Sequence, residues 1–167
     1  MDSTHPEHNP VISYGRIKKG EEFEVLTHNS FRYRLNINGA VDIESLDVIT
    51  RRSERVNSMS ICELLRIIRA KNSTGELIQL IMDNAAYNRS SKVKELANEL
   101  VYLPPYSPNL NPIERLWKFF KKKVLYNKYY ETREYFESAC TNFFRYIRKY
   151  RKELSTLLTD EFHVLGT

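Results

Sequence analysis

The segment LPPYSPNLNPIERLWKFFKKK, residues 103–123, constrains the fold more than any other stretch of the chain. It holds four of the chain's six prolines, and they precede a single glutamate, Glu114, near the start of a basic helix. Each proline fixes its own φ and restricts the residue before it, so the path into this helix has few conformations. A metal-binding carboxylate needs such a rigid lead-in if it must meet a second carboxylate on another element. We therefore expect the prolines to place Glu114 at a functional site.

The remaining pattern predicts strands first and helices afterwards. Short strands are expected over 12–20 and 21–29, and residues 32–50 alternate around Asn38-Gly39, a pair typical of a two-residue hairpin turn. Helical spacing follows over 58–72, 91–100, 112–126 and 132–150. The apolar runs LIQLIM (77–82) and LVYLP (100–104) predict buried strands of a parallel sheet. This order favours an α/β fold, a mixed sheet with helices on both faces.

Composition limits the class of protein. At 167 residues, without repeats or flexible linkers, the chain is expected to form a single domain. A net charge of +5 suits a polyanionic partner without requiring one. Cys62 and Cys140 fall in apolar helical patterns, which predicts reduced core thiols and a cytoplasmic protein. No apolar run approaches the ~18 residues of a membrane span, and the polar N-terminus is unlike a signal peptide, so we expect a soluble protein.

Two acidic residues stand at the ends of predicted elements. Asp83 follows the apolar run directly, and ligands of open α/β sheets bind at the carboxyl ends of strands. Taken alone, Asp83 is more simply a turn residue and Glu114 a partner of the helix dipole. The rigid proline loop favours the alternative, in which both acids serve one site.

Three segments of the chain carry a family resemblance: MDNAAYNRS, LPPYSPNLNPIERLWKFFK and DSTHPEHNPVISYGRIKKGE. They resemble the catalytic domain of the DDE transposases, in the bacterial insertion-sequence branch of the mariner superfamily, over nearly the whole chain. The resemblance implies a ribonuclease-H-like fold in which two aspartates and one glutamate bind two divalent metal ions. It assigns Asp2, Asp83 and Glu114 as the catalytic, metal-binding acids. The interval between the last two is slightly short for this family, which a shorter surface helix over 91–100 would accommodate.

The chemistry implied by the resemblance is hydrolysis of phosphodiester bonds at transposon ends, followed by attack of the freed 3′-hydroxyl on target DNA. The implied cofactor is a pair of Mg²⁺ ions, for which Mn²⁺ can substitute, because hard cations prefer carboxylate oxygens. The implied partner is DNA, bound by a dimer that pairs two ends. His5 and His8 lack the further ligands of a zinc site, and His5 is expected near the metals or a phosphate. Asn84 and Asn88 receive no firm role.

The helix that Pro112 opens is both basic and amphipathic. Its cations are expected to contact DNA, although a solvated face remains open: Arg115, Lys118, Lys121, Lys122 and Lys123. Trp117 shares the helical spacing of the apolar residues, which favours a core position over base stacking. A second basic and aromatic stretch, FRYIRKYRK (144–152), is better explained as a solvated helix end.

The N-terminus departs from the family pattern. The first acid of the family ends the central strand of the sheet, whereas only Met1 precedes Asp2. We therefore expect a domain over 1–167 that is truncated at its N-terminus, with its first central strand largely missing and no helix-turn-helix. Two functions stay open: a strand-cleaving and strand-transferring enzyme that acts as part of a longer product, or an inactive remnant with at most nonspecific DNA binding.

Overall fold

The computed structural model describes residues 1–9, 11, 18–20, 22, 33–72, 77–97, 99–104 and 110–159. The strands predicted over 12–20 and 21–29 fall almost entirely outside these residues, as do the prolines at 105 and 108. In chain order the elements are β1 (Asp2–Thr4), β2 (Asn36–Val41), β3 (Val48–Ser53), α1 (Ser58–Lys71), β4 (Gln79–Met82), η1 (Ala86–Arg89), α2 (Ser91–Leu96), β5 (Glu99–Tyr102), α3 (Pro112–Val124), α4 (Arg133–Arg145), η3 (Ile147–Tyr150) and α5 (Arg151–Thr159).

Strand pairing divides the described strands into two sheets. β1, β2 and β3 form an antiparallel sheet in that order, and β4 pairs with β5 in parallel. The amino group of Met1 donates to the Ile81 carbonyl at 2.7 Å, which ties the start of β1 to β4. The predicted α/β class, with both antiparallel and parallel strand pairing, is therefore confirmed. The described strands nevertheless form two separate sheets rather than one. β1 has three residues, as expected of a short first strand.

The predicted hairpin exists, but its predicted turn is wrong. Asn38 and Gly39 lie inside β2, where Gly39 pairs with Thr50 of β3. The chain reverses over 42–47 instead, and the Asp42 carboxylate accepts hydrogen bonds from the backbone N–H groups of Glu44 and Ser45. This Asx-type turn satisfies backbone donors locally, so the reversal needs no Asn-Gly pair.

Packing explains why Asn and Gly occupy the middle of β2. Asn38 is fully buried, accepts from the Ser3 hydroxyl at 2.7 Å and donates to the Ser53 hydroxyl at 3.1 Å. A Cβ on Gly39 would lie 2.5 Å from Cη2 of Trp117, which is closer than real contacts allow. Gly39 is thus required by the close approach of the indole ring rather than by a turn.

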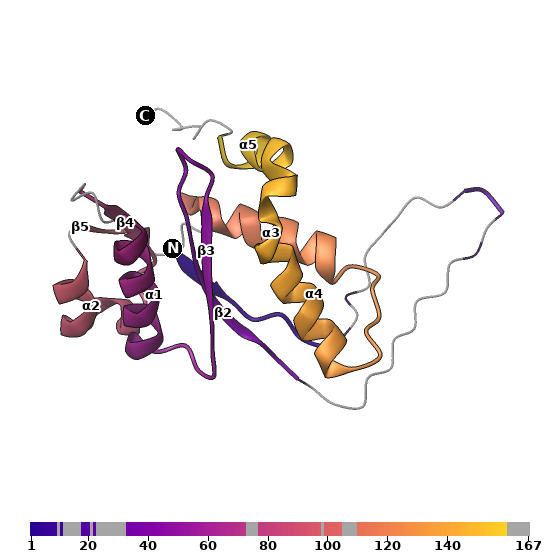
Figure 1. Cartoon of the computed structure of the whole chain (residues 1–167), viewed down its shortest axis with the longest axis horizontal. Helices are drawn as coiled ribbons and strands as arrows, with labels where there is room; N and C mark the ends of the chain where they lie inside the picture. The colour runs from indigo at the N-terminus through magenta and orange to yellow at the C-terminus, as the bar shows by residue number, and fades with distance from the viewer. Residues whose placement is uncertain are drawn as a thin grey trace.

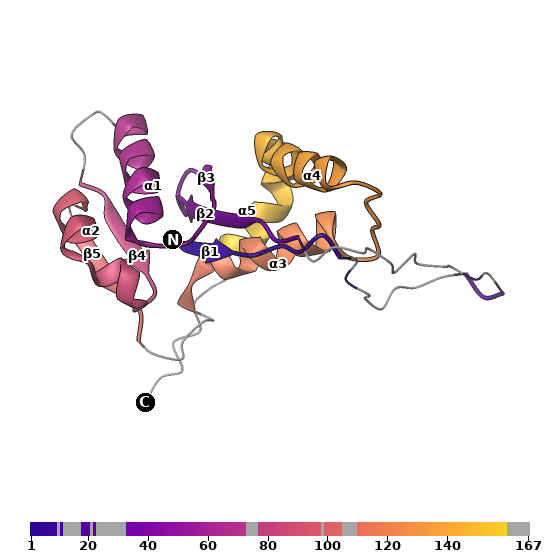
Figure 2. The same cartoon turned by 90° about the horizontal axis from the view of Figure 1, so that it is seen from below.

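The helices agree with the predicted positions more closely than with the predicted lengths. α1 ends at Lys71, one residue before its predicted end, and its C-cap Asn72 donates its backbone N–H to the Arg69 and Ile68 carbonyls. α2 ends at Leu96, four residues earlier than predicted, because 99–102 pairs with β4. The last predicted helix ends at Arg145 and is followed by η3 and α5. In Figure 1, α1 and α2 lie beside β4 and β5, whereas α3, α4 and α5 gather around the antiparallel sheet, and Figure 2 shows the same division from below.

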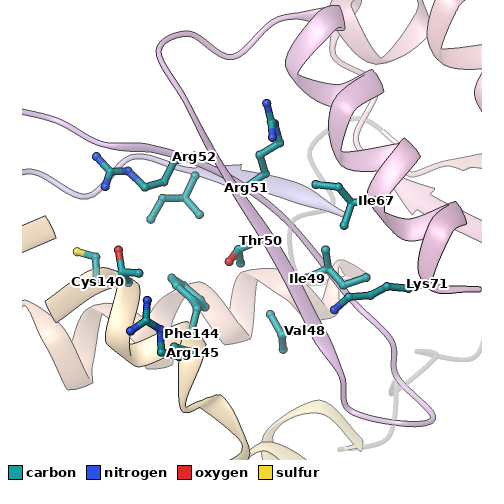
Figure 3. Close-up of a pocket in the computed structure, with 12 residues that line it drawn as sticks. Val48, Ile49, Thr50, Arg51, Arg52, Ile67, Lys71, Cys140, Phe144 and Arg145 are labelled. Carbon is teal, nitrogen blue, oxygen red and sulfur yellow. The ribbon is translucent and has the colours of Figure 1, made fainter. Parts of the chain in front are cut away.

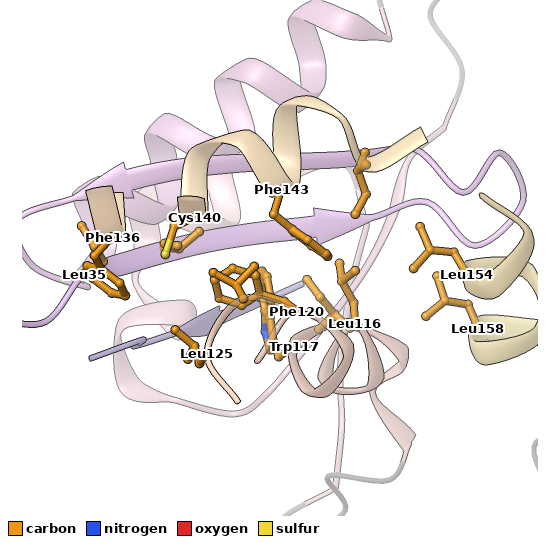
Figure 4. Close-up of a cluster of buried hydrophobic side chains, with 14 residues drawn as sticks. Leu35, Leu116, Trp117, Phe120, Leu125, Phe136, Cys140, Phe143, Leu154 and Leu158 are labelled. Atoms are coloured by element: carbon orange, nitrogen blue, oxygen red, sulfur yellow. The ribbon is translucent and has the colours of Figure 1, made fainter. Parts of the chain in front are cut away.

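Two hydrophobic clusters form the core, one mainly in each of these two groups of elements. One joins α3, α4 and α5 to β2, and its members Phe120 and Phe136 are fully buried (Figure 4). The other packs α1 between the sheets and includes Met1 and Met82. Trp117 is 4% exposed, which confirms its predicted core position. The rigid hydrophobic face of α3 therefore fixes the helix that carries Glu114.

The two thiols are buried and free, as expected of reduced core cysteines. Burial raises the pKa of Cys140 to about 12, so this thiol stays protonated and unreactive. Within the described residues, the helices are all too short or too polar to cross a bilayer.

Candidate active site

Asp83 is held at the carboxyl end of β4. Its Oδ1 accepts hydrogen bonds from the Ala85 backbone N–H at 3.2 Å and from Asn88 Nδ2 at 2.6 Å. The first is the turn-type contact expected of an isolated aspartate, and the second comes from a side chain that is 5% exposed. Together they orient the carboxylate rigidly.

Glu114 lies in the first turn of α3, where Pro112 opens the helix and Glu114 N–H donates to the Asn111 carbonyl at 3.0 Å. Burial raises the pKa of Glu114, and the negative charges of Asp2 and Asp83 add to this effect, while Lys118 opposes it. The helix dipole favours a carboxylate at this position. The side chain is half-buried, so it is neither free in solvent nor enclosed in the core.

Asp2 lies in β1, opposite Gly39. Its Oδ2 accepts a hydrogen bond from the indole N–H of Trp117 at 3.0 Å. Burial raises the pKa of Asp2, and the charge of Asp83 contributes in the same direction, whereas the Trp117 hydrogen bond and the terminal ammonium oppose it. Burial also lowers the pKa of the Met1 ammonium to about 6, against the attraction of both aspartates.

The three predicted acids share one electrostatic neighbourhood. Each of the pairs Asp2–Asp83, Asp2–Glu114 and Asp83–Glu114 repels, and the repulsion contributes to the raised pKa values. β1, the end of β4 and the start of α3 thus bring three carboxylates near one another from distant parts of the sequence. Like charges at close range favour a cation between them. A two-metal site would place the carboxylates of Asp83 and Glu114 about 4–8 Å apart, which stays a prediction.

A complete metal cluster is not preformed in the described part of the chain. No group of three or more His, Cys, Asp or Glu side chains there is arranged to hold a metal ion. Within the described part of the chain, two buried amide oxygens nevertheless lack a hydrogen-bond partner, Asn88 Oδ1 beside Asp83 and Asn111 Oδ1 before α3. An unsatisfied buried acceptor costs roughly 1–3 kcal/mol. Carboxylate and amide oxygens are the ligands, directly or through water, of hard divalent cations, so this donor set fits the implied metal.

Asn111 was missed by the sequence analysis. It is 3% exposed, and its Nδ2 lies 3.4 Å from the Met1 carbonyl, so it links the start of α3 to β1. Its only signal in the sequence is its place before Pro112, where asparagine is typical of an N-cap. The side chain makes no capping hydrogen bond in the structure.

The predicted DNA-binding set is only partly brought together. Lys118, Lys121 and Lys122 lie on the same side of α3 as Glu114, within about 100° of the helix circumference. Arg115 instead donates to the Leu157 carbonyl of α5 at 3.1 Å. Lys123 lies on the opposite flank, where its Nζ is 3.9 Å from the Glu153 carboxylate of α5. The surface formed by Lys118, Lys121 and Lys122, which we call the acid-side lysines, therefore continues from the candidate site.

His5 is exposed, and its Nδ1 lies 2.8 Å from Asn36 Oδ1. The expectation that it lies near a metal or phosphate stays a prediction.

A cavity of about 530 Å³ lies away from the acids, between β3, α1 and α4 (Figure 3). Four cations line it: Arg51, Arg52, Lys71 and Arg145. The first two form ion pairs of 2.8 Å with Glu63 and Glu137. The other two lie in the last turns of α1 and α4, where cations complement the helix dipole. Ion pairs and helix ends therefore account for the four cations that line this cavity.

A family profile described as DDE superfamily endonuclease matches residues 1–137. The match covers most of the chain, so the protein belongs to the DDE superfamily endonucleases. Among curated proteins, the uncharacterized protein y4pE/y4sA of Sinorhizobium fredii (strain NBRC 101917 / NGR234) is 40% identical over 53 residues, 31% of this chain and 39% of its own length.

Solved structures of similar fold include the Mos1 mariner paired-end complex with Mn (TM-score 0.63, 16% identity, 94% of this chain and 52% of that chain). They also include the Mos1 paired-end complex with the left transposon end (TM-score 0.62, 16% identity, 94% and 53%) and the Mos1 strand transfer complex (TM-score 0.60, 15% identity, 96% and 54%). At this identity the likeness confirms the predicted transposase-type fold. The chain spans about half the length of the Mos1 chains.

Proposed function

We propose that this chain is the catalytic domain of a DDE transposase, which cuts phosphodiester bonds at transposon ends and joins the freed 3′-hydroxyl to target DNA. The observation that carries the proposal is the convergence of Asp2, Asp83 and Glu114, whose charges repel pairwise although they come from three elements. Membership of the DDE endonuclease family supports it independently.

In this proposal the three acids hold two divalent ions, Mg²⁺ or alternatively Mn²⁺. The ions would supply activation of the attacking oxygen and stabilisation of the leaving oxygen. The protein's own part is orientation: Asn88 fixes Asp83 and Trp117 fixes Asp2 through the hydrogen bonds at 2.6 Å and 3.0 Å. Partners of this kind around a metal site typically change metal affinity 10–100-fold when they are removed. Structures of Mos1 named as complexes with Mn and with Mg support a divalent cofactor.

The proposed partner is DNA, engaged by a dimer that brings two transposon ends together. The acid-side lysines supply positive charge next to the acids, where a scissile phosphate must lie. The solved complexes of Mos1 are named as paired-end and strand-transfer assemblies, which supports this partner. Because the chain spans about half of the Mos1 chains, we propose that it is the DDE domain of a longer product and that recognition of the ends lies outside it.

An inactive remnant is the second candidate. The observation that favours it is the absence of a preformed metal cluster among the described side chains. A remnant would keep the fold and some affinity for DNA without cleaving it.

A cleavage assay on the element's own flanking ends decides between them. Four proteins are compared with and without Mg²⁺ or Mn²⁺: the 167-residue chain, a version extended by the upstream reading frame, and that version carrying Asp83→Asn or Glu114→Gln. We expect little cleavage by the short chain and metal-dependent cleavage by the extended protein. Each substitution should reduce cleavage to background while leaving DNA binding nearly intact.

The exposed Glu95→Gln on α2 provides a charge-matched control that should keep full activity. Cleavage that survives Asp83→Asn would refute the catalytic assignment, and absence of cleavage by every version would favour the remnant. Strong metal-dependent cleavage by the short chain would show that β1 suffices to place Asp2.

A further inference from the structure

A second cavity, of about 190 Å³, lies where the C-terminal end of α3 meets α4, η3 and the loop between α3 and α4. Its lining combines three lysines with four aromatic residues: Lys123, Lys128, Lys149, Tyr130, Phe143, Tyr146 and Tyr150. No carboxylate lines the cavity among the described residues. In the larger cavity, by contrast, Arg51 and Arg52 form ion pairs of 2.8 Å with Glu63 and Glu137.

A backbone carbonyl and aromatic rings position the lysines of this cavity. Lys128 Nζ donates to the Lys123 carbonyl at 2.6 Å. Lys123 Nζ lies 5.1 Å from the ring centroid of Tyr150, and Lys149 Nζ lies 4.9 Å from that of Tyr146. Cation–π contacts of this length hold an ammonium group in place but leave its charge uncompensated. These contacts already restrict the three lysine side chains, so less conformational entropy is lost when a ligand binds.

The charges around the cavity do not balance. Within the described part of the chain, one carboxylate approaches, that of Glu153 at 3.9 Å from Lys123 Nζ, and it is about half exposed. Lys128 and Lys149 form no ion pair there. Three cations against one anion repel one another, and an anion in the cavity would relieve this repulsion.

The volume of the cavity and its lining residues indicate which kind of anion it can bind. A volume of about 190 Å³ is below the ~300 Å³ lower end of pockets for drug-sized ligands but holds a phosphate group. Lysines bind phosphate as point charges, and the ring of Tyr146, 50% exposed, borders the opening. Given the proposed function, on which this step rests, the phosphate belongs to a DNA backbone.

The cavity and the acid-side lysines face different directions. At 100° per residue, Lys123 lies about 160° around α3 from Lys121, and it lies about 13 Å along the axis from Glu114. The two positions thus lie on different flanks of α3, so a DNA segment that follows the acid-side lysines leaves this cavity to another segment. We propose that the cavity of Lys123, Lys128 and Lys149 binds a backbone phosphate of a second DNA segment, distinct from the one at the acids.

The test uses the chain as it exists and a 30-base-pair duplex. Lys128→Gln/Lys149→Gln is compared with Lys92→Gln/Lys94→Gln, which removes the same charge from exposed positions on α2. If both lysines neutralise phosphates, the slope of log K against log salt should fall by up to about 1.8 in the first variant and stay unchanged in the second. In the wild type, the duplex should also shield Lys128 and Lys149 from acetylation, as mapped by mass spectrometry.

Equal slopes in both variants, with no shielding in the wild type, would overturn the second DNA site while leaving the catalytic proposal intact. Shielding of both lysines, combined with cleavage that survives Asp83→Asn in the extended protein, would support the second site and refute the catalytic proposal. The shielding measurement uses the wild type, so it decides the question even if the double variant folds poorly.

Discussion

Trp117 connects the hydrophobic core to the candidate active site through one side chain. Its ring packs on Gly39 of β2, and its indole N–H donates to Asp2 at 3.0 Å. The same residue was expected in the core from its helical spacing, which is confirmed, but its hydrogen bond to an acid has no signature in the sequence. Orientation of Asp2 therefore depends on the absence of a side chain at Gly39.

Gly39→Ala tests this dependence. The added Cβ would meet Trp117 Cη2 at 2.5 Å, so the ring must move. We expect a loss of about 1–3 kcal/mol in the free energy of unfolding, typical of overpacking, and a shift in the fluorescence of the chain's single tryptophan. Urea denaturation and emission spectra measure both effects.

A smaller ring serves as the control. In a Trp117→Phe background, Gly39→Ala should cost clearly less, because the atoms that clash are gone. An equal cost in both backgrounds would show that the ring does not impose glycine at this position.

Only some residues of the candidate site can be recognised from the sequence alone. Asp83 and Glu114 were found because one follows an apolar run and the other follows rigid prolines. Asn88 and Asn111 were not assigned, because their significance comes from burial and from oxygens left unpaired, which depend on neighbours far away in the sequence.

Among the elements, α4 is tied through Glu137 to β3 and to Tyr33 in the segment before β2. Its carboxylate accepts hydrogen bonds from the Tyr33 hydroxyl and from Arg133 at 2.9 Å, and pairs with Arg52 at 2.8 Å. Burial disfavours the charged form, but these hydrogen bonds and the arginine charge outweigh it and lower the pKa of Glu137 to about 2. The network stabilises the contact of α4 with the antiparallel sheet only while Glu137 is ionised.

Stability should therefore depend on pH through Glu137. The pKa of Glu137 is lower in the folded state than its ordinary value of 4.5. The ionised carboxylate therefore contributes fully to the free energy of unfolding above pH 4.5, and this contribution is lost as the pH falls to about 2. Glu137→Gln should lower the free energy of unfolding by about 1–2 kcal/mol at pH 7, and the difference from wild type should shrink between pH 4.5 and 2. Urea titrations across this range measure it, and a difference independent of pH would contradict the assignment.

Element types were predictable from the sequence, whereas several boundaries were not. Periodicity identified α1, α3 and the parallel pair of β4 and β5, because long apolar patterns survive in any tertiary context. The end of α2 and the break after α4 depend on what each segment packs against. The Asn38-Gly39 pair gave a wrong turn prediction, because a glycine can be required by close packing as well as by a turn.

At the scale of the whole molecule, the net charge of +5 is distributed unevenly. Arg115 and Arg52 are used in internal contacts, whereas the acid-side lysines project from α3 beside the acids. Binding to DNA should therefore be weak, independent of sequence and sensitive to salt.

Replacing Lys118, Lys121 and Lys122 by alanine should reduce the slope of log K against log salt by up to about 2.7, because each phosphate that is no longer neutralised lowers it by about 0.9. Fluorescence anisotropy with a labelled duplex at several salt concentrations measures the slope. Alanine at the exposed Lys71, Lys92 and Lys94 removes equal charge elsewhere and should leave it unchanged. Equal slopes for the two triple variants would identify the lysines of α3 as a solvated face.

Binding of Mn²⁺, followed by the paramagnetic resonance signal of the free ion, tests most directly whether Asp2, Asp83 and Glu114 form one divalent-metal site. We expect the protein to bind Mn²⁺, and Asp83→Asn and Glu114→Gln each to weaken binding at least 10-fold, while Glu95→Gln binds like the wild type. Equal Mn²⁺ affinity in wild type and in both acid-site variants would contradict a shared site for these carboxylates.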